Sequence, residues 1–172
     1  MGKIIYPGTF DPITKGHIDI VERALHIFDE VIIGVAANVK KDSSLTLDQR
    51  FQLVQQVLKK YDHVRVEKFS GLLIDFAQQQ NVFVVLRGLR AVSDFEYEFQ
   101  LANTNRALDK RLETVFLTPA EQYAYISSSM VREIASLGGN VSAFVPEEVS
   151  KLLVFTGTKC CAPTIGKKNI SF

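Results

Sequence analysis

Short runs of β-branched and aromatic residues alternate along this chain with segments whose apolar residues recur every three or four positions. The runs are almost continuously apolar, which is typical of strands buried on both faces of a parallel sheet. Strand–helix alternation from the first residues onward predicts an open α/β sheet with right-handed crossovers. The predicted strands are Lys3–Tyr6, Val31–Ala36, Val64–Val66, Val82–Leu86 and Thr114–Leu117.

Helical spacing occupies the segments between these runs. Pro146 and the two glutamates after it predict one more helix, because proline suits a first turn and carboxylates favour the positive end of the helix dipole. We therefore predict one α/β, Rossmann-like domain over residues 1–155, with an open, mainly parallel five-stranded sheet and helices on both faces. The apolar stripes lie within Ile18–Phe28, Leu47–Leu58, Leu73–Ala77, Phe95–Ala102 and Val131–Ala135.

The pattern changes after Phe155. Glycines, a proline and lysines interrupt any period, so residues 156–172 are predicted to form a basic C-terminal tail, which contains the adjacent pair Cys160–Cys161. The balance of 20 Lys+Arg against 19 Asp+Glu gives no overall field for nucleic acid or an anionic membrane. No apolar run approaches the roughly 18 residues of a membrane span. We expect a cytoplasmic protein that binds neither nucleic acid nor membranes.

The segment Tyr6–His17 follows the first predicted strand, and ligands of parallel α/β sheets bind beyond the carboxyl ends of strands. Gly8 lets the backbone approach a ligand, and Thr9 adds a hydroxyl. Thr14 can cap the next helix, which puts His17 in a first turn where free N–H groups favour phosphate. The alternative is a plain turn with His17 on the surface.

Two arginines follow the fourth predicted strand, in Arg87-Gly88-Leu89-Arg90. Their planar guanidinium groups are suited to bidentate binding of phosphates. The alternative interpretation is that they form ion pairs with Asp94, Glu96 or Glu98, which follow closely.

Two further segments are candidates for anion binding. The serines of Tyr125–Arg132 precede a helix and could hold a phosphate cluster, although a serine run is often a plain cap. Lys40 and Lys41 follow the second strand, where a lysine pair is often simply solvated. Four such segments after different strands of one sheet favour a shared anion site. Neither a dinucleotide fingerprint nor a P-loop motif is present.

Thr14-Lys15-Gly16-His17 resembles the TxGH signature of the nucleotidyltransferase superfamily. Together with Tyr6–Pro12, Arg87–Arg90 and Ile126–Ser129, it makes the chain similar to the bacterial phosphopantetheine adenylyltransferase family from about residue 3 to residue 155. The resemblance implies transfer of an adenylyl group from ATP to 4′-phosphopantetheine, which yields dephospho-coenzyme A and pyrophosphate in coenzyme A biosynthesis. It also implies a Mg²⁺ cofactor, without naming its ligands, and a homohexamer.

The same resemblance implies roles for individual residues. His17 would stabilise the transition state of a direct in-line attack, and no general base is needed because the attacking phosphate is already ionised at neutral pH. Phosphopantetheine would contact Thr9, Lys41, Leu73 and Arg87. ATP would contact Thr9, Phe10, His17, Gly88, Leu89, Arg90, Glu98, Tyr123, Ala124, Tyr125, Ile126, Ser127, Ser128 and Ser129.

Three points stay open at this level. The loop Asn38–Asp42 lacks the proline that commonly precedes the family's lysine, so Lys40 competes with Lys41 for that role. Another TxGH nucleotidyltransferase, acting on nicotinate mononucleotide or of the cytidylyl type, shares the signature. A nucleotide-binding module without turnover is the third alternative, and it would not require a second anion site at Thr9, Lys41 and Arg87.

Overall fold

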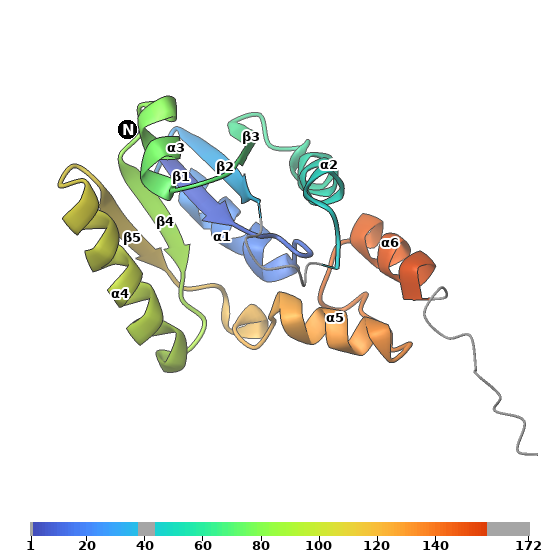
Figure 1. Ribbon diagram of the computed structural model, residues 1–172. Helices are drawn as coiled ribbons and strands as arrows, with labels where there is room; N and C mark the ends of the chain where they lie inside the picture. Colours follow the sequence, from blue (N-terminus) through green and yellow to red (C-terminus); the bar gives the residue numbers. More distant parts are fainter. Residues whose placement is uncertain (1, 38–43, 158–172) are drawn as a thin grey trace, which may run out of the picture.

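Five parallel strands lie side by side in the order β3-β2-β1-β4-β5 in the computed structural model, which describes residues 2–37 and 44–157 (Figure 1). All four neighbouring pairs are parallel, which confirms the predicted fold class. The strands are β1 (Lys3–Gly8), β2 (Glu30–Ala36), β3 (Val64–Phe69), β4 (Val84–Gly88) and β5 (Glu113–Leu117).

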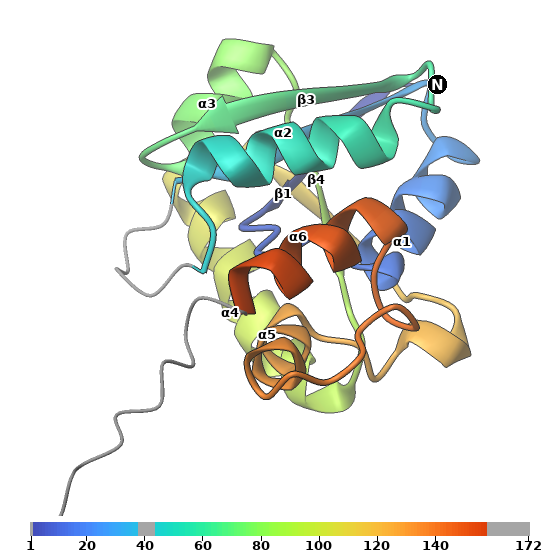
Figure 2. The same ribbon diagram turned by 90° about the vertical axis from the view of Figure 1, so that its right-hand side faces the viewer.

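Helices cover both faces of the sheet. α6 packs against both α2 and α5 (Figure 2). It extends to Gly157, two residues past the predicted end of the domain at residue 155, and residues 158–172 lie outside the described part of the chain. No helix within the described ranges is both long and apolar enough to cross a membrane. The helices are α1 (Lys15–Leu25), α2 (Leu47–Leu58), α3 (Leu73–Gln80), α4 (Val92–Leu108), the 3₁₀ turn η1 (Glu121–Tyr123), α5 (Ser128–Ser136) and α6 (Glu147–Gly157).

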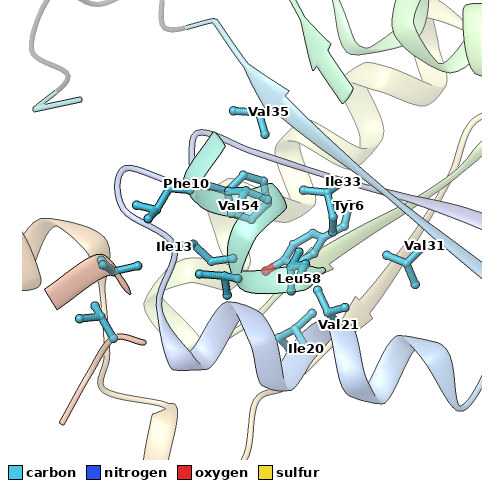
Figure 3. Close-up of a cluster of buried hydrophobic side chains, with 14 of the residues drawn as sticks. Tyr6, Phe10, Ile13, Ile20, Val21, Val31, Ile33, Val35, Val54 and Leu58 are labelled. Atoms are coloured by element: carbon cyan, nitrogen blue, oxygen red, sulfur yellow. The ribbon is translucent and has the colours of Figure 1, made fainter. Parts of the chain in front are cut away.

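Alternate residues of the central strands enter two different cores. Ile4 and Tyr6 point into the larger cluster, with side chains of α1, α2, α5 and α6 (Figure 3). Ile5 enters a smaller cluster with Phe76 and Ala77 of α3 on the opposite face. Because successive strand residues point to opposite faces, a strand covered on both sides must be apolar throughout. The continuous apolar runs in the sequence have this origin.

β4 begins two residues later than the predicted run Val82–Leu86. Asn81 ends α3 in the left-handed conformation, and the Val82 N–H donates to the carbonyl of Ala77, so Val82 still belongs to the helix end. Arg87 and Gly88 are therefore the last residues of β4, paired in register with β5, rather than the start of a loop.

α4 also differs from the prediction. Phe95 and Phe99 were expected to mark a core-facing stripe, yet their side chains are 44% and 50% exposed and stack on each other at 5.5 Å. Apolar residues occur all around this helix, so the spacing of its phenylalanines does not define the buried side. Its packing contacts are with α3 and β5, at the edge of the sheet.

The strand order reverses between β1 and β4. The chain leaves β1 toward β2 and β3 and then returns to β4 on the other side of β1. Crossovers on either side of such a point run to opposite faces, so their loops part and open a crevice beyond the carboxyl ends of the strands. α5 lies at the end toward which the β4 arrow points (Figure 1).

Candidate active site

A cleft of about 1050 Å³ opens at this reversal point. Its walls come from the β1–α1 loop, the end of β4, the connection from η1 into α5, and one side of α4. Most residues predicted for substrate or ATP binding line it: Thr9, Phe10, His17, Leu73, Arg87, Gly88, Arg90, Glu98, Tyr123, Ile126, Ser127, Ser128 and Ser129.

Three of the predicted residues that the structure describes, Leu89, Ala124 and Tyr125, do not line this cleft. Leu89 extends the pairing of β4 and β5 by donating its N–H to the Leu117 carbonyl at 2.9 Å. Ala124 closes the turn of η1, and the Tyr125 side chain is 64% exposed. Lys41 lies outside the described residues, as does Lys40.

His17 is held in one orientation by the residue that caps its helix. The Thr14 N–H donates to Nδ1 of His17 at 3.0 Å, and the Thr14 hydroxyl lies 3.0 Å from the same nitrogen. The His17 N–H in turn donates to that hydroxyl at 3.4 Å, which completes a capping box. Because Nδ1 accepts a backbone N–H, the ring proton sits on Nε2.

Burial lowers the pKa of His17 to about 4, and the positive charge of Arg90 acts in the same direction. A buried imidazole is harder to charge because the cation loses its hydration. His17 is therefore neutral at physiological pH. Its Nε2–H group is a hydrogen-bond donor with a fixed direction at the N-terminus of α1.

Phe10 supports His17 from the side. Its ring lies edge-on to the rings of Tyr6 and His17, with centroids 5.5 Å and 5.1 Å away. The Phe10 backbone has a φ of 47°, an unusual value for a residue with a side chain. A Cβ on Gly8 would lie 3.0 Å from this ring, so glycine at that position makes room for Phe10, and Gly8 also lines the cleft.

Arg50 of α2 fixes the β1–α1 loop from behind. Its side chain is only 1% exposed, and it donates to the carbonyls of Thr9, Ala36 and Leu45 at 2.5, 2.8 and 3.3 Å. The sequence analysis missed this residue. The sequence did contain a signal for it. Arg50 directly precedes Phe51 and falls on the apolar face of a predicted helix, and a charge buried there needs several hydrogen-bond partners.

Asp11 connects the same loop to two other segments. Its carboxylate accepts the N–H groups of Ser44 and Leu45 at 3.0 and 3.2 Å. Its carbonyl accepts a hydrogen bond from Arg132 of α5, which also lines the cleft. Arg132 was likewise not predicted as a site residue, although it closes the serine-rich motif.

Arg87 and Arg90 both have carboxylate partners on α4. Arg87 donates from Nε and Nη2 to the two oxygens of Glu98 at 2.6 and 2.7 Å. Arg90 donates to Asp94 at 3.1 and 3.3 Å and to the Ile126 carbonyl at 3.1 Å. The ion pairs considered as an alternative to phosphate binding are thus present, and both arginines line the cleft as well.

The serine run caps α5 at the cleft. Ser127 is the N-cap and accepts the Met130 N–H at 3.1 Å. Ser128 donates its hydroxyl to the Pro12 carbonyl at 2.9 Å, which joins α5 to the β1–α1 loop. The cleft therefore receives two helix N-termini, those of α1 and α5, both capped by a hydroxyl side chain. Helix N-termini of this kind favour anions.

A family model described as cytidylyltransferase-like matches residues 5–134, about three-quarters of the chain. The chain belongs to this family, within the nucleotidyltransferase superfamily. The matched residues contain the Thr14–His17 signature, all three arginines that line the cleft and the serine run, so the cytidylyltransferase-like match covers most of the cleft.

The fold is similar to that of a crystal structure from Vibrio parahaemolyticus, of a protein assigned as a nicotinate-nucleotide adenylyltransferase. The TM-score is 0.65 at 20% sequence identity, and the similarity covers 91% of this chain and 94% of the other. At this identity the similarity concerns the fold, which extends through α6 beyond the matched family region.

Mg²⁺ was expected from the resemblance. Within residues 2–37 and 44–157, no group of three His, Cys, Asp or Glu side chains could hold a metal ion. The cleft carboxylates Asp94 and Glu98 are engaged by arginines. Mg²⁺ usually binds through one or two carboxylates together with substrate phosphates rather than in a cage made only of protein ligands.

Proposed function

We propose that the protein transfers the adenylyl group of ATP to 4′-phosphopantetheine and releases dephospho-coenzyme A and pyrophosphate. One observation carries the choice of acceptor. The cleft does not end at the anion-binding groups but continues past Arg87, between α3 and α4 and over β4. We call this part the acceptor arm, and its lining residues are Leu73, Val85, Leu101, Ala102, Asn105 and Thr114.

The acceptor arm has the dimensions and chemistry for a long, uncharged chain. From Glu98 to Asn105 the wall of α4 advances by about 10 Å, at 1.5 Å per residue. Its lining is apolar, with one amide and one hydroxyl. A pantetheine chain carries two amides and a hydroxyl on an otherwise apolar backbone. Nicotinate carries a carboxylate on a flat ring, and the acceptor-arm residues include no cation to pair with it.

The other side of the cleft suits the ATP triphosphate. It combines the N-termini of α1 and α5, the Nε2–H of His17 and the guanidinium of Arg90, all of which favour oxyanions. A nucleotide in this position would place its α-phosphate between the two sides, within reach of an acceptor phosphate held near Thr9 and Arg87.

The reaction then needs alignment more than acid–base chemistry. An oxygen of the acceptor phosphate attacks the α-phosphorus of ATP. The bond from that phosphorus to the bridging oxygen of pyrophosphate breaks, and pyrophosphate leaves with the electron pair. His17, oriented by Thr14, donates from Nε2 to a non-bridging oxygen as its negative charge grows. A preorganised donor of this type typically contributes about 2.7–4 kcal/mol to the transition state.

Self-association as a homohexamer belongs to the same proposal, since only the family resemblance implies it. Sedimentation velocity on the purified protein checks the oligomeric state. A hexamer supports the resemblance, and a monomer at micromolar concentration contradicts it.

The proposal is tested by the dependence of pyrophosphate release on the acceptor. We expect release from ATP only when 4′-phosphopantetheine is added, with dephospho-coenzyme A identified by mass spectrometry. Turnover with nicotinate mononucleotide, or with CTP as nucleotide donor, would identify a different transferase. ATP binding in calorimetry without pyrophosphate release with any acceptor would identify a binding module.

A further inference from the structure

Residues 118–124 connect β5 to the end of η1, and we call them the η1 segment. Pro119 and Tyr123 of this segment line the cleft, shortly before the N-terminus of α5. The segment therefore belongs to the side of the cleft that holds the anion-binding groups. The Ala120 N–H donates to the Asp19 carboxylate at 2.8 Å, and this hydrogen bond joins the η1 segment to α1.

Little else fixes the η1 segment to the rest of the cleft wall. Within residues 2–37 and 44–157, its other hydrogen bonds are internal or go to Ile126. It also packs against the first turn of α1, where a Cβ placed on Gly16 would lie 3.6 Å from the Tyr123 carbonyl oxygen. That is an ordinary van der Waals distance, which leaves room for a shift, whereas a hydrogen bond is directional. The bond to Asp19 is therefore what sets the position of the segment.

Asp19 is placed on α1 two residues after His17. Its side chain is 15% exposed, and its oxygen Oδ2 accepts both the Ala120 N–H and Nε of Arg23, each at 2.8 Å. A carboxylate that accepts a backbone N–H makes a charge-assisted hydrogen bond, which is stronger than one between neutral groups. This bond crosses 101 positions of the sequence, so it joins two parts of the cleft wall that the chain itself does not hold together.

We infer that Asp19 is a positioning residue for ATP, which acts by holding Ala120 and, through it, the η1 segment at a fixed place beside His17. The inference rests on the proposed function for the identity of the nucleotide. Because His17 donates to the α-phosphate in that mechanism, the wall that binds ATP must keep its place relative to the helix that carries His17. A misplacement of about 1 Å can cost about 10²-fold in rate. Asp19 does not itself line the cleft, so it acts through Ala120.

The two partners of Asp19 can be separated by substitution. Asp19→Ala removes both the hydrogen bond to Ala120 and the ion pair. Asp19→Asn removes the ion pair and keeps an oxygen that can accept the Ala120 N–H. Arg23→Gln removes the ion pair alone and is the matched control, since Arg23 is 47% exposed and a pair of this kind contributes little.

Calorimetry gives the Kd for ATP, and steady-state kinetics give the KM for the acceptor. We expect Asp19→Ala to raise the Kd for ATP about tenfold, the scale of one charge-assisted hydrogen bond, and to change the acceptor KM less than about twofold. Asp19→Asn should stay within about threefold of wild type, because it rescues the acceptor oxygen. Arg23→Gln should bind ATP as the wild-type protein does.

Three results would overturn the inference. An unchanged Kd for ATP in Asp19→Ala, with a lowered melting temperature, would reduce Asp19 to a structural residue. A Kd raised as much by Asp19→Asn or by Arg23→Gln as by Asp19→Ala would show that the charge matters and not the hydrogen bond to Ala120. A raised acceptor KM with an unchanged Kd for ATP would place the η1 segment on the other side of the cleft.

Failure of the proposed function would be recognised with the wild-type protein, before any variant is made. Wild-type protein that binds no ATP would refute both the proposed function and the role of Asp19. Wild-type protein that binds ATP and uses nicotinate mononucleotide would refute the proposed acceptor alone. The Kd for ATP is measured without an acceptor, so the order of the three variants would still decide whether Asp19 acts through Ala120.

Discussion

The two walls of the cleft are built in opposite ways. The β1–α1 loop is buried, with Phe10 at 2% and Asp11 at 3% exposure, and side chains from α2 and α5 fix its backbone. α4, the facing wall, exposes Phe95 and Phe99, and none of its side chains whose burial is described, those from Asp94 onward, belongs to the buried core. Two ion pairs, Arg87 with Glu98 and Arg90 with Asp94, connect α4 to the centre of the cleft. The buried loop holds the candidate catalytic donor, and the exposed helix holds the acceptor side.

This difference corresponds to two different demands. A donor to a transition state must already be in place, because reorganisation during the reaction would cost the free energy that it supplies. His17 meets this demand through Thr14 and Phe10, which depend in turn on the buried loop. A wall that accepts a flexible chain has no such requirement, and α4 can be set by its contacts with the ligand.

The largest effect should appear in the free energy of unfolding. One phenylalanine from each wall allows the two walls to be compared directly. We expect Phe10→Ala to lower the free energy of unfolding by about 3–5 kcal/mol, because it removes a buried ring and leaves a cavity beside Tyr6. Phe99→Ala should cost about 1 kcal/mol or less, since the ring is half exposed. Urea denaturation measures both. Equal losses would show that α4 is packed as tightly as the loop.

The sequence predicted the parts of this structure that are local. Strand runs such as Val31–Ala36 were found because burial on both faces makes every residue apolar. The capping role of Thr14 followed from its place before a helix, which the hydrogen bond to His17 confirms. The position of the cleft followed from the rule that ligands bind at the carboxyl ends of parallel strands.

What the sequence could not predict depends on contacts between distant residues. Arg50 binds a carbonyl 41 positions earlier, and Arg132 binds one 121 positions earlier. For Arg87, the sequence left open which of three carboxylates would be its partner, and only the path of α4 selects Glu98. The buried side of α4 could not be predicted either, because the helix's own apolar residues are distributed around its whole circumference.

The next effect concerns catalysis by His17, which belongs to the wall formed around the β1–α1 loop. His17→Ala should lower kcat by about 10²–10³ and change the KM for ATP by less than about threefold, since the donor acts mainly on charge that develops in the transition state. Steady-state kinetics of pyrophosphate release provide both constants. His26→Ala, an exposed histidine at the end of the same helix, is the control and should behave as wild type. An unaffected His17→Ala enzyme would contradict the mechanism.

A smaller effect is expected on the facing wall. Leu101→Ala should raise the KM for 4′-phosphopantetheine about fivefold and leave kcat and the KM for ATP nearly unchanged, because a shortened apolar side chain removes about 1 kcal/mol of binding energy from the acceptor arm. Gln100→Ala changes the neighbouring exposed side chain and should have no effect. If Leu101→Ala instead altered the KM for ATP, the two sides of the cleft would have to be exchanged.

The smallest effect is expected from pH on the rate. Because burial holds the pKa of His17 near 4 in the free protein, its ring should add no inflection to the pH dependence of kcat/KM between pH 6 and pH 8. The free energy of unfolding, in contrast, should depend on pH at lower values. The unfolded chain takes up a proton at His17 below its ordinary pKa of about 6.5, whereas the folded chain does so only near 4, so folding loses stability as pH falls between these values. His17→Gln removes that loss, and urea denaturation of both proteins at pH 7 and pH 5 measures it. An inflection of kcat/KM near pH 6.5 that is absent from the His17→Gln variant, together with parallel stability curves, would show that His17 is accessible to protons and that the buried wall is less closed than its contacts indicate.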